Sequence, residues 1–181
     1  VNTPYAWHWE AAYPQAYGFT DDPKVPEQVN VSVAQNLRRA DGRVTNMSSG
    51  RGRGRSFHNG RIDQRPGAVD YGFNAQEQWK RALSLDPPFV MVTGWNEWIA
   101  GRWSRPGDPV VFVDQYNQEY SRDIEPAKRA HKDHYYYQLV ANVRRYKGMP
   151  SLPAPSPPKT MSLAGDFTAW KSVAPLYRDH V

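Results

Sequence analysis

The sequence predicts an α/β fold, namely the C-terminal part of a (β/α)8 barrel followed by a Pro-rich linker and the first strand of a truncated second domain. Over residues 1–149, three apolar runs that suit strands alternate with two stretches of helical periodicity. A barrel of this kind closes with eight strands. Because only three are visible, we expect earlier β/α units to precede this chain.

The expected strands cover residues 5–9, 29–34 and 89–93. In the first, Trp7 and Trp9 alternate with polar neighbours, and the second, VNVSVA, has β-branched residues at alternate positions. The third, FVMVT, is continuously apolar, as in parallel strands covered on both faces. Residues 37–72 are rich in Arg, Asp and Gly without periodicity, which predicts a long solvated loop.

Two helices are expected after this loop. Asn74 occupies an N-cap position with Glu77 three residues later, and Asp86-Pro87-Pro88 ends the helix. The second helix is expected over residues 133–147. The predicted buried stripes are Ala75, Trp79, Ala82 and Leu83 in the first helix and Tyr136, Leu139, Val140, Val143 and Tyr146 in the second.

Three segments are predicted along the chain: a barrel portion at 1–149, a linker at 150–161 and the start of another domain at 162–181. The linker contains SLPAPSPPKT, a composition typical of extended, semi-rigid spacers. The last segment is too short to fold alone. Its turn at Gly165-Asp166, followed by Phe167 and Trp170, predicts an opening strand.

Composition narrows the functional classes. The chain has no cysteine, which excludes disulfides and thiolate metal sites, and no apolar run approaches the roughly 18 residues of a membrane span. Between Arg38 and Arg65, eight Arg and two Asp give a balance of +6, against +5 for the whole chain. Because the positive charge is confined to one Gly-rich stretch, we expect no nucleic-acid-binding face.

Chemistry-bearing side chains follow the expected strands, at the ends where α/β barrels place their active sites. Glu10 follows the first strand, Gln35 and Asn36 the second, and Glu97 the third. Five of the seven tryptophans lie near these ends: Trp7, Trp9, Trp95, Trp98 and Trp103. Since indole faces pack on sugar rings while amides and carboxylates bind hydroxyls, the sequence predicts a carbohydrate partner.

Glu97 is the candidate catalytic group. It lies in VTGWNEWIAGRW among three tryptophans, where desolvation would raise its pKa and suit a general acid. Glu10 is the candidate second carboxylate, and His8 is an alternative acid. The competing interpretation of Glu97 is a structural carboxylate bound to backbone or to Arg102. The candidate substrate-binding residues are Trp7, His8, Trp9, Gln35, Asn36, Arg55, His58, Trp95, Asn96, Trp98 and Trp103.

The TGWNEW stretch, the loop FVDQYNQEYSRDIEP and the helix DHYYYQLVANVRRYKG resemble the last-strand region of (β/α)8 glycoside hydrolases of family 99 and WbsX-like proteins. The resemblance covers about a third of the chain. It implies a glycan-cleaving enzyme in which Glu97 belongs to a catalytic carboxylate pair. The family's second carboxylate lies three residues later, where this chain has Ala100.

A second resemblance concerns LAGDFTAWKSVAPLYRD, which is similar to the first strand of a family 9-type carbohydrate-binding β-sandwich. Together the two resemblances imply a glycoside hydrolase acting on an oligosaccharide or polysaccharide, without a cofactor. They also imply a secreted or periplasmic location.

Three alternatives stay open. The barrel could bind a glycan without cleaving it, with Ala100 marking a lost carboxylate. RGRGR, residues 51–55, could bind RNA, although it lacks interleaved aromatics. The acids Asp114, Glu119, Asp123 and Glu125 could act in catalysis or hold calcium, although they do not follow the EF-hand pattern and we expect no metal.

Overall fold

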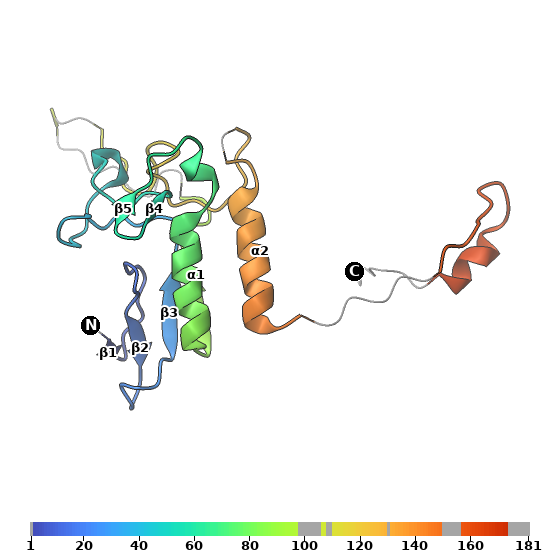
Figure 1. Cartoon of the computed structure of the whole chain (residues 1–181), viewed down its shortest axis with the longest axis horizontal. Helices are drawn as coiled ribbons and strands as arrows, with labels where there is room; N and C mark the ends of the chain where they lie inside the picture. The colour runs from blue at the N-terminus through green and yellow to red at the C-terminus, as the bar shows by residue number, and fades with distance from the viewer. Residues whose placement is uncertain (1, 98–105, 108–109, 130, 150–156, 174–181) are drawn as a thin grey trace. The chain divides into compact units, whose positions relative to one another are not determined.

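The computed structural model describes residues 2–97, 106–107, 110–129, 131–149 and 157–173 (Figure 1). The chain divides into two compact units, Val1–Lys147 and Gly148–Val181. Trp98, Ala100, Arg102 and Trp103 lie outside the described residues, so the roles expected for them stay predictions.

The first unit is built on a four-stranded mixed sheet. Strands β1 (Thr3–Pro4), β2 (Tyr17–Phe19), β3 (Gln28–Val31) and β6 (Phe89–Val92) lie in the order β1-β2-β3-β6. β2 is antiparallel to β3, while β3 pairs in parallel with β6. Because helix α1 (Phe73–Leu85) connects the parallel pair, β3-α1-β6 is a β/α unit. The α/β expectation is confirmed, and the described residues do not form a closed barrel.

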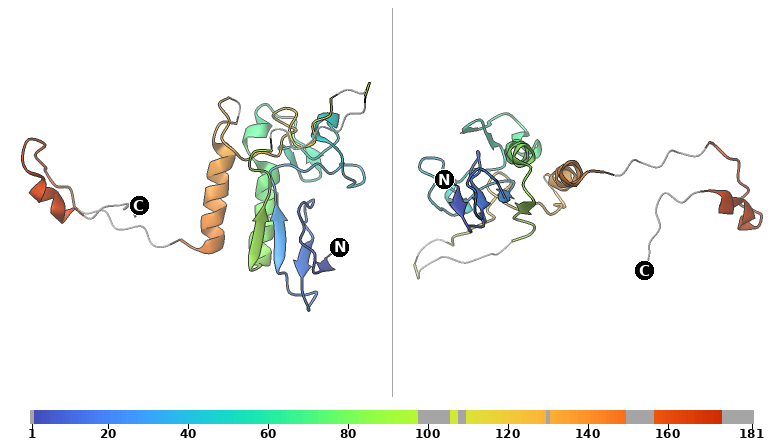
Figure 2. Two further views of the ribbon diagram at one scale, coloured as in Figure 1. Left: turned by 180° about the vertical axis from the view of Figure 1, so that it is seen from behind. Right: turned by 90° about the horizontal axis from the view of Figure 1, so that it is seen from below.

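Helix α1 and helix α2 (His134–Lys147) lie side by side (Figures 1 and 2). The core forms where Trp79 and Ala82 of α1 pack on Val29 and Val31 of β3. Leu139, Val143 and Tyr146 of α2 pack against the same cluster. The predicted apolar stripe of α1 is thus confirmed. In α2 the prediction is wrong for Tyr136, which is exposed, while Tyr135 is buried instead.

Helix α1 begins differently from the prediction. Its N-cap is Gly72, with φ 67°, and no side chain caps it. Asn74 lies inside the helix, where its amide nitrogen donates to Gln35 Oε1 at 3.1 Å and to the Gly54 carbonyl at 2.8 Å. The capping prediction is wrong because tertiary partners of a buried amide override the local capping preference. The predicted end is confirmed, since α1 stops at Leu85 before Asp86.

Residues 5–9 do not form the predicted strand. Tyr5 has φ 56°, a left-handed conformation that interrupts extended backbone. The chain then follows β3 through side-chain hydrogen bonds: His8 N donates to Gln28 Oε1 at 3.0 Å, and Ala11 N donates to Asn30 Oδ1 at 3.3 Å. The neighbour of β3 in the sheet is instead β2, within a segment that the sequence marks only as polar.

Residues 37–72 are ordered rather than a solvated loop. They contain short 3-10 helices at Met47–Ser49 and Ala68–Asp70, and a hairpin of β4 (Phe57–His58) and β5 (Arg61–Ile62). Gln35 and Arg53 exchange two backbone hydrogen bonds, of 2.8 and 2.9 Å. This pairing draws the basic stretch inward, and Arg55 becomes fully buried.

In the second unit, a 3-10 helix covers Phe167–Ser172, where the sequence predicts a strand. The Asp166 side chain accepts a hydrogen bond from Thr168 N at 3.3 Å and so caps this helix. The described residues of the second unit contain no strand.

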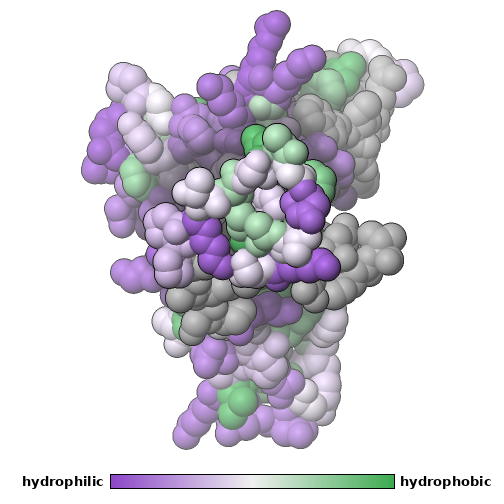
Figure 3. All heavy atoms as spheres, turned by 90° about the vertical axis from the view of Figure 1, so that its right-hand side faces the viewer, coloured by the Kyte–Doolittle hydropathy of each residue, from purple (hydrophilic) through white to green (hydrophobic). Residues whose placement is uncertain are grey.

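Hydrophilic residues predominate on the face drawn in Figure 3, and hydrophobic residues form only small separate patches there. Among the described residues, no helix has the length and apolar character that a membrane crossing requires.

Candidate functional site: a carboxylate cluster around Arg122

The carboxyl ends of β3 and β6 meet at one edge of the sheet because the two strands are parallel. Asn36 lies beyond the end of β3, and Glu97 lies beyond the end of β6. Ligand sites of α/β proteins lie at such ends. The structure therefore brings two of the predicted site residues to the expected edge.

Residues 113–125 dock against the end of β6. Ile124 N donates to the Gly94 carbonyl at 2.8 Å, and the Ile124 side chain is buried with Val33 and Tyr135. Gly94 has φ 84°, and a Cβ there would lie 2.3 Å from the Arg122 carbonyl oxygen. The glycine of TGWNEW thus permits the close approach that brings Asp114, Arg122 and Asp123 to Glu97.

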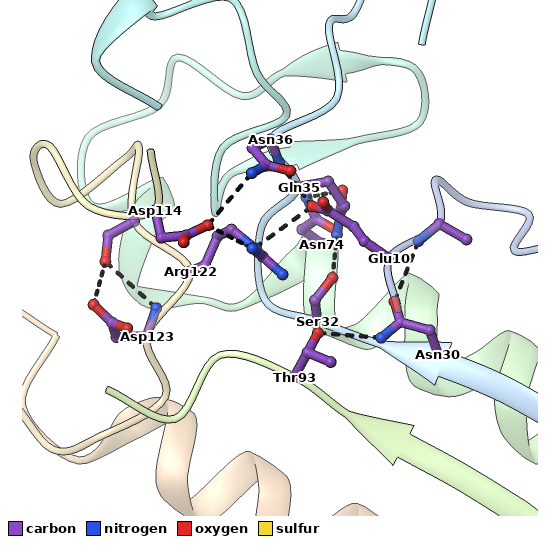
Figure 4. Close-up of polar contacts among 12 residues, drawn as sticks. Glu10, Asn30, Ser32, Gln35, Asn36, Asn74, Thr93, Asp114, Arg122 and Asp123 are labelled. Atoms are coloured by element: carbon purple, nitrogen blue, oxygen red, sulfur yellow. Dashed lines mark hydrogen bonds and ion pairs between the residues drawn. The ribbon is translucent and has the colours of Figure 1, made fainter. Parts of the chain in front are cut away.

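Arg122 is the centre of the site. Its guanidinium lies between Asp114, which accepts from Nη1 at 2.5 Å, and Glu10, whose Oε1 lies 3.5 Å from Nε (Figure 4). All three side chains are largely buried: Arg122 is 6% exposed, Asp114 5% and Glu10 11%. We call Glu10, Glu97, Asp114 and Asp123 the carboxylate cluster.

Glu10 is fixed from two sides. Besides Arg122, the backbone N–H of Asn36 donates to Glu10 Oε1 at 2.7 Å. Burial raises the pKa of Glu10, and the Arg122 charge and the Asn36 hydrogen bond oppose this shift only in part.

The Asn36 side chain lies between Glu10 and Asp114. As drawn in Figure 4, its nitrogen donates to Asp114 Oδ1 at 3.4 Å while its oxygen faces Glu10. Turning the amide by 180° places the nitrogen 3.2 Å from Glu10 Oε1 and removes the contact between two acceptors. We therefore assign the Asn36 donor to Glu10.

Glu97 lies at the open side of the cluster. Its backbone N–H donates to Asp123 Oδ1 at 2.8 Å. The pKa of its carboxyl group is raised, first by a hydrogen bond with the Asp114 carboxyl group, then by desolvation and by the Asp114 charge. The predicted rise in pKa is present, but the expected cause is wrong: the neighbouring carboxylate outweighs burial, because Glu97 is an exposed residue.

Trp95 and Asn96, the other predicted residues of the box TGWNEW that the structure describes, are accessible. Trp95 is 47% exposed, and its ring meets Tyr136 edge-on at a centroid distance of 6.1 Å. Asn96 is exposed. Trp95 therefore presents indole surface beside Glu97, as sugar stacking requires.

Several predicted substrate-binding residues lie elsewhere. Trp7 packs on Phe89, the first residue of β6, with ring centroids 4.9 Å apart, so it lies at the opposite end of β6 from Glu97. His8 is bonded through its backbone to Gln28, near that same end. Trp9 is 64% exposed. Gln35 is buried, and its amide bonds Ser32 and Asn74.

The two basic candidates are also engaged in the fold. His58 Nε2 contacts Asp63 Oδ2 at 3.1 Å on the β4–β5 hairpin. Arg55 has no exposed surface, and its guanidinium lies 4.3 Å above the Tyr135 ring and donates to Ser121 Oγ at 3.2 Å. A substrate cannot reach a side chain that is covered in this way, so the substrate-binding role predicted for Arg55 is wrong.

The sequence did not indicate Arg122, and it did not distinguish Asp114 from the acids Glu119, Asp123 and Glu125. The available signal was the single Arg in SRDIEP, within an acidic loop that follows the TGWNEW box. Within the described ranges, no group of three or more His, Asp or Glu side chains is arranged to hold a metal ion. Of the four acids in the calcium alternative, Asp114 is paired with Arg122.

No family model, no curated protein and no solved structure matches this chain.

Proposed function

We propose that this protein hydrolyses glycosidic bonds in an oligosaccharide or polysaccharide, with Glu97 as the general acid. The observation that carries this proposal is the contact between the Glu97 and Asp114 carboxyl groups at the carboxyl end of β6. The raised pKa of Glu97 favours the protonated form of an accessible carboxyl group. Such a proton can be transferred to the oxygen of a leaving sugar.

Three neighbouring features support this assignment. Arg122, which also pairs with the buried Glu10, holds Asp114 in place. Trp95 offers an exposed indole next to the acid. The resemblance of TGWNEW to the last-strand box of family 99 and WbsX-like glycoside hydrolases points to the same residue. We assign to Glu10 a positioning role rather than the catalytic one expected from the sequence. Arg122 and the Asn36 backbone N–H both contact its Oε1, and the turned Asn36 amide lies next to Oε2.

The resemblances also support the finer architecture. We propose that residues 1–149 are the C-terminal part of a (β/α)8 barrel, in which β3-α1 and β6-α2 are two β/α units. Residues 162–181 would then begin a carbohydrate-binding β-sandwich after the linker at 150–161.

A second candidate is a barrel that binds glycans without cleaving them. Ala100, at the position of the family's second carboxylate, favours it. RNA binding through residues 51–55 gains no support, since Arg55 is buried and Arg53 is partly buried.

The test uses Glu97→Gln, with Glu77→Gln on α1 as the matched control. Cleavage and binding are measured on a panel of manno-, gluco- and galacto-oligosaccharides. We expect Glu97→Gln to lose about 10²–10⁴-fold in turnover with similar affinity, while the control keeps both. A parent protein that binds but never cleaves would favour the second candidate. Unchanged cleavage by Glu97→Gln would contradict the acid role.

A further inference from the structure

A hollow of about 360 Å³ adjoins the carboxylate cluster on the Asp123 side, and ten residues from Gln115 to His131 line it. We call it the Asp123 hollow. Asp123 belongs to both places, because it lines the hollow and its Oδ1 accepts the backbone N–H of Glu97 at 2.8 Å. The hollow is therefore next to the proposed acid, and its volume lies at the lower end of the roughly 300–1,000 Å³ typical of small-molecule sites.

His131 is the polar group built into its wall. It is 7% exposed, and its ring meets Tyr135 edge-on at 5.2 Å. The Glu125 backbone lies near enough to favour the protonated ring, yet neither ring nitrogen has a hydrogen-bonding partner of good geometry among the described residues. Because both nitrogens are themselves buried, the ring forms part of the wall and is not a point of contact for a ligand.

The imidazole is neutral near neutral pH. Burial, with a smaller effect of the Arg55 charge, lowers the pKa of His131 to about 4. The ring of His131 therefore adds no charge to the wall of the hollow.

The charged side chains that line the hollow have no net charge. Two are acidic, Asp123 and Glu125, and two are basic, Lys128 and Arg129. An anion would approach two carboxylates, and a cation would approach two basic side chains. The lining therefore favours a polar ligand without net charge.

Three side-chain amides complete the lining: Gln115, Asn117 and Gln118. Asn117 Oδ1 accepts from Tyr120 N at 2.8 Å, and Asn117 and Gln118 are exposed. Because each amide can both donate and accept, the three together match several hydroxyl groups at once. We propose that the Asp123 hollow is a subsite for a neutral sugar ring, which holds a further unit of the glycan that Glu97 acts on.

This proposal rests on the proposed function, and binding beside His131 tests it separately from cleavage. The probes are D-mannose, D-glucose and D-galactose, with D-glucuronate and D-glucosamine as charged counterparts. ¹H–¹³C spectra of the imidazoles follow each titration of the whole chain. We expect at least one neutral sugar to shift the His131 signals saturably, and Glu97→Gln to keep this binding.

The variant Gln118→Ala removes one exposed amide of the hollow, and Gln64→Ala is the matched control outside it. We expect about a fivefold loss of affinity in the first and none in the second. The subsite is excluded if no neutral sugar moves His131, if Gln118→Ala binds as the parent does, or if glucuronate or glucosamine binds more tightly. Cleavage that depends on Glu97 without sugar binding beside His131 would overturn the subsite alone. Binding there without cleavage would overturn the hydrolase.

Discussion

The Glu97 carboxyl group hydrogen-bonds the Asp114 carboxyl group, and this contact is the largest effect on the pKa of Glu97. Asp114 in turn accepts from Arg122 Nη1. The hydrogen bond and the charge of Asp114 both disfavour ionisation of Glu97, which is why the pKa of Glu97 is raised. Glu97 is an exposed residue, so a ligand can reach its carboxyl group.

Replacing Asp114 by Asn should lower the pKa of Glu97. The substitution removes the charge next to Glu97 and offers an amide N–H that favours the ionised form. A ¹³C titration of the side-chain carboxyl carbons measures the change. Asp41→Asn, far along the chain on an exposed turn, serves as the control and should leave the Glu97 titration in place. A Glu97 pKa that stays raised in Asp114→Asn would show that another group causes the shift.

Arg55 should be a stabilising residue. Its buried guanidinium lies over Tyr135 at 4.3 Å and donates to Ser121 Oγ and to the Asp123 carbonyl. Arg55→Met should lower the free energy of unfolding by about 2 kcal/mol or more, because charged hydrogen bonds are lost from a buried site. Arg51→Ala, in the same RGRGR stretch but exposed, should change it by less than about 0.5 kcal/mol. Denaturant unfolding compares the two, and equal effects would contradict the assignment.

Trp95 should contribute to glycan binding, whereas Trp7 should not. Trp95 exposes indole surface beside Glu97, and Trp7 lies at the other end of β6 against Phe89. We expect Trp95→Ala to weaken oligosaccharide affinity about tenfold, which corresponds to about 1.4 kcal/mol, with the fold intact. Trp7→Ala is the matched control. Calorimetric titration of both variants decides, and a loss confined to Trp7→Ala would place the sugar at the opposite edge.

The free energy of unfolding should depend on pH because of Glu10. Its pKa is raised in the folded protein by burial, so folding favours the protonated form. The stability that it contributes is fully present below its unfolded pKa and is lost as the pH rises through the folded value. Glu10→Gln lacks this titration. Its unfolding free energy relative to the parent should therefore increase as the pH rises from about 4 to 7. If the difference in unfolding free energy between Glu10→Gln and the parent were constant over this range, the Arg122 charge would fully offset the effect of burial on the pKa of Glu10.

The sequence predicts well those features that depend on local periodicity. The strand at β6, the end of α1 before Pro87 and the extent of α2 follow from apolar spacing and proline chemistry. Parallel pairing of β3 with β6 then brings Asn36 and Glu97 to one edge, as expected.

Features that depend on tertiary contacts could not be predicted in this way. Arg55 lies in a basic, Gly-rich stretch that resembles a solvated loop, yet it is buried because Tyr135, more than seventy residues later, covers it. Asn74 has the place of a cap and instead pairs with Gln35. Arg122 was missed because its importance comes from Glu10 and Asp114, which only the folded chain brings together.

The central claim is that the carboxyl groups of Glu97 and Asp114 act together in glycan hydrolysis. A double-mutant cycle on turnover tests it most directly, with Glu97→Gln, Asp114→Asn and the double variant assayed on the same oligosaccharide. Because residues that act as a unit are not additive, we expect the double variant to lose no more turnover than the worse single variant. Losses that multiply, or near-parent turnover in Glu97→Gln, would contradict the account.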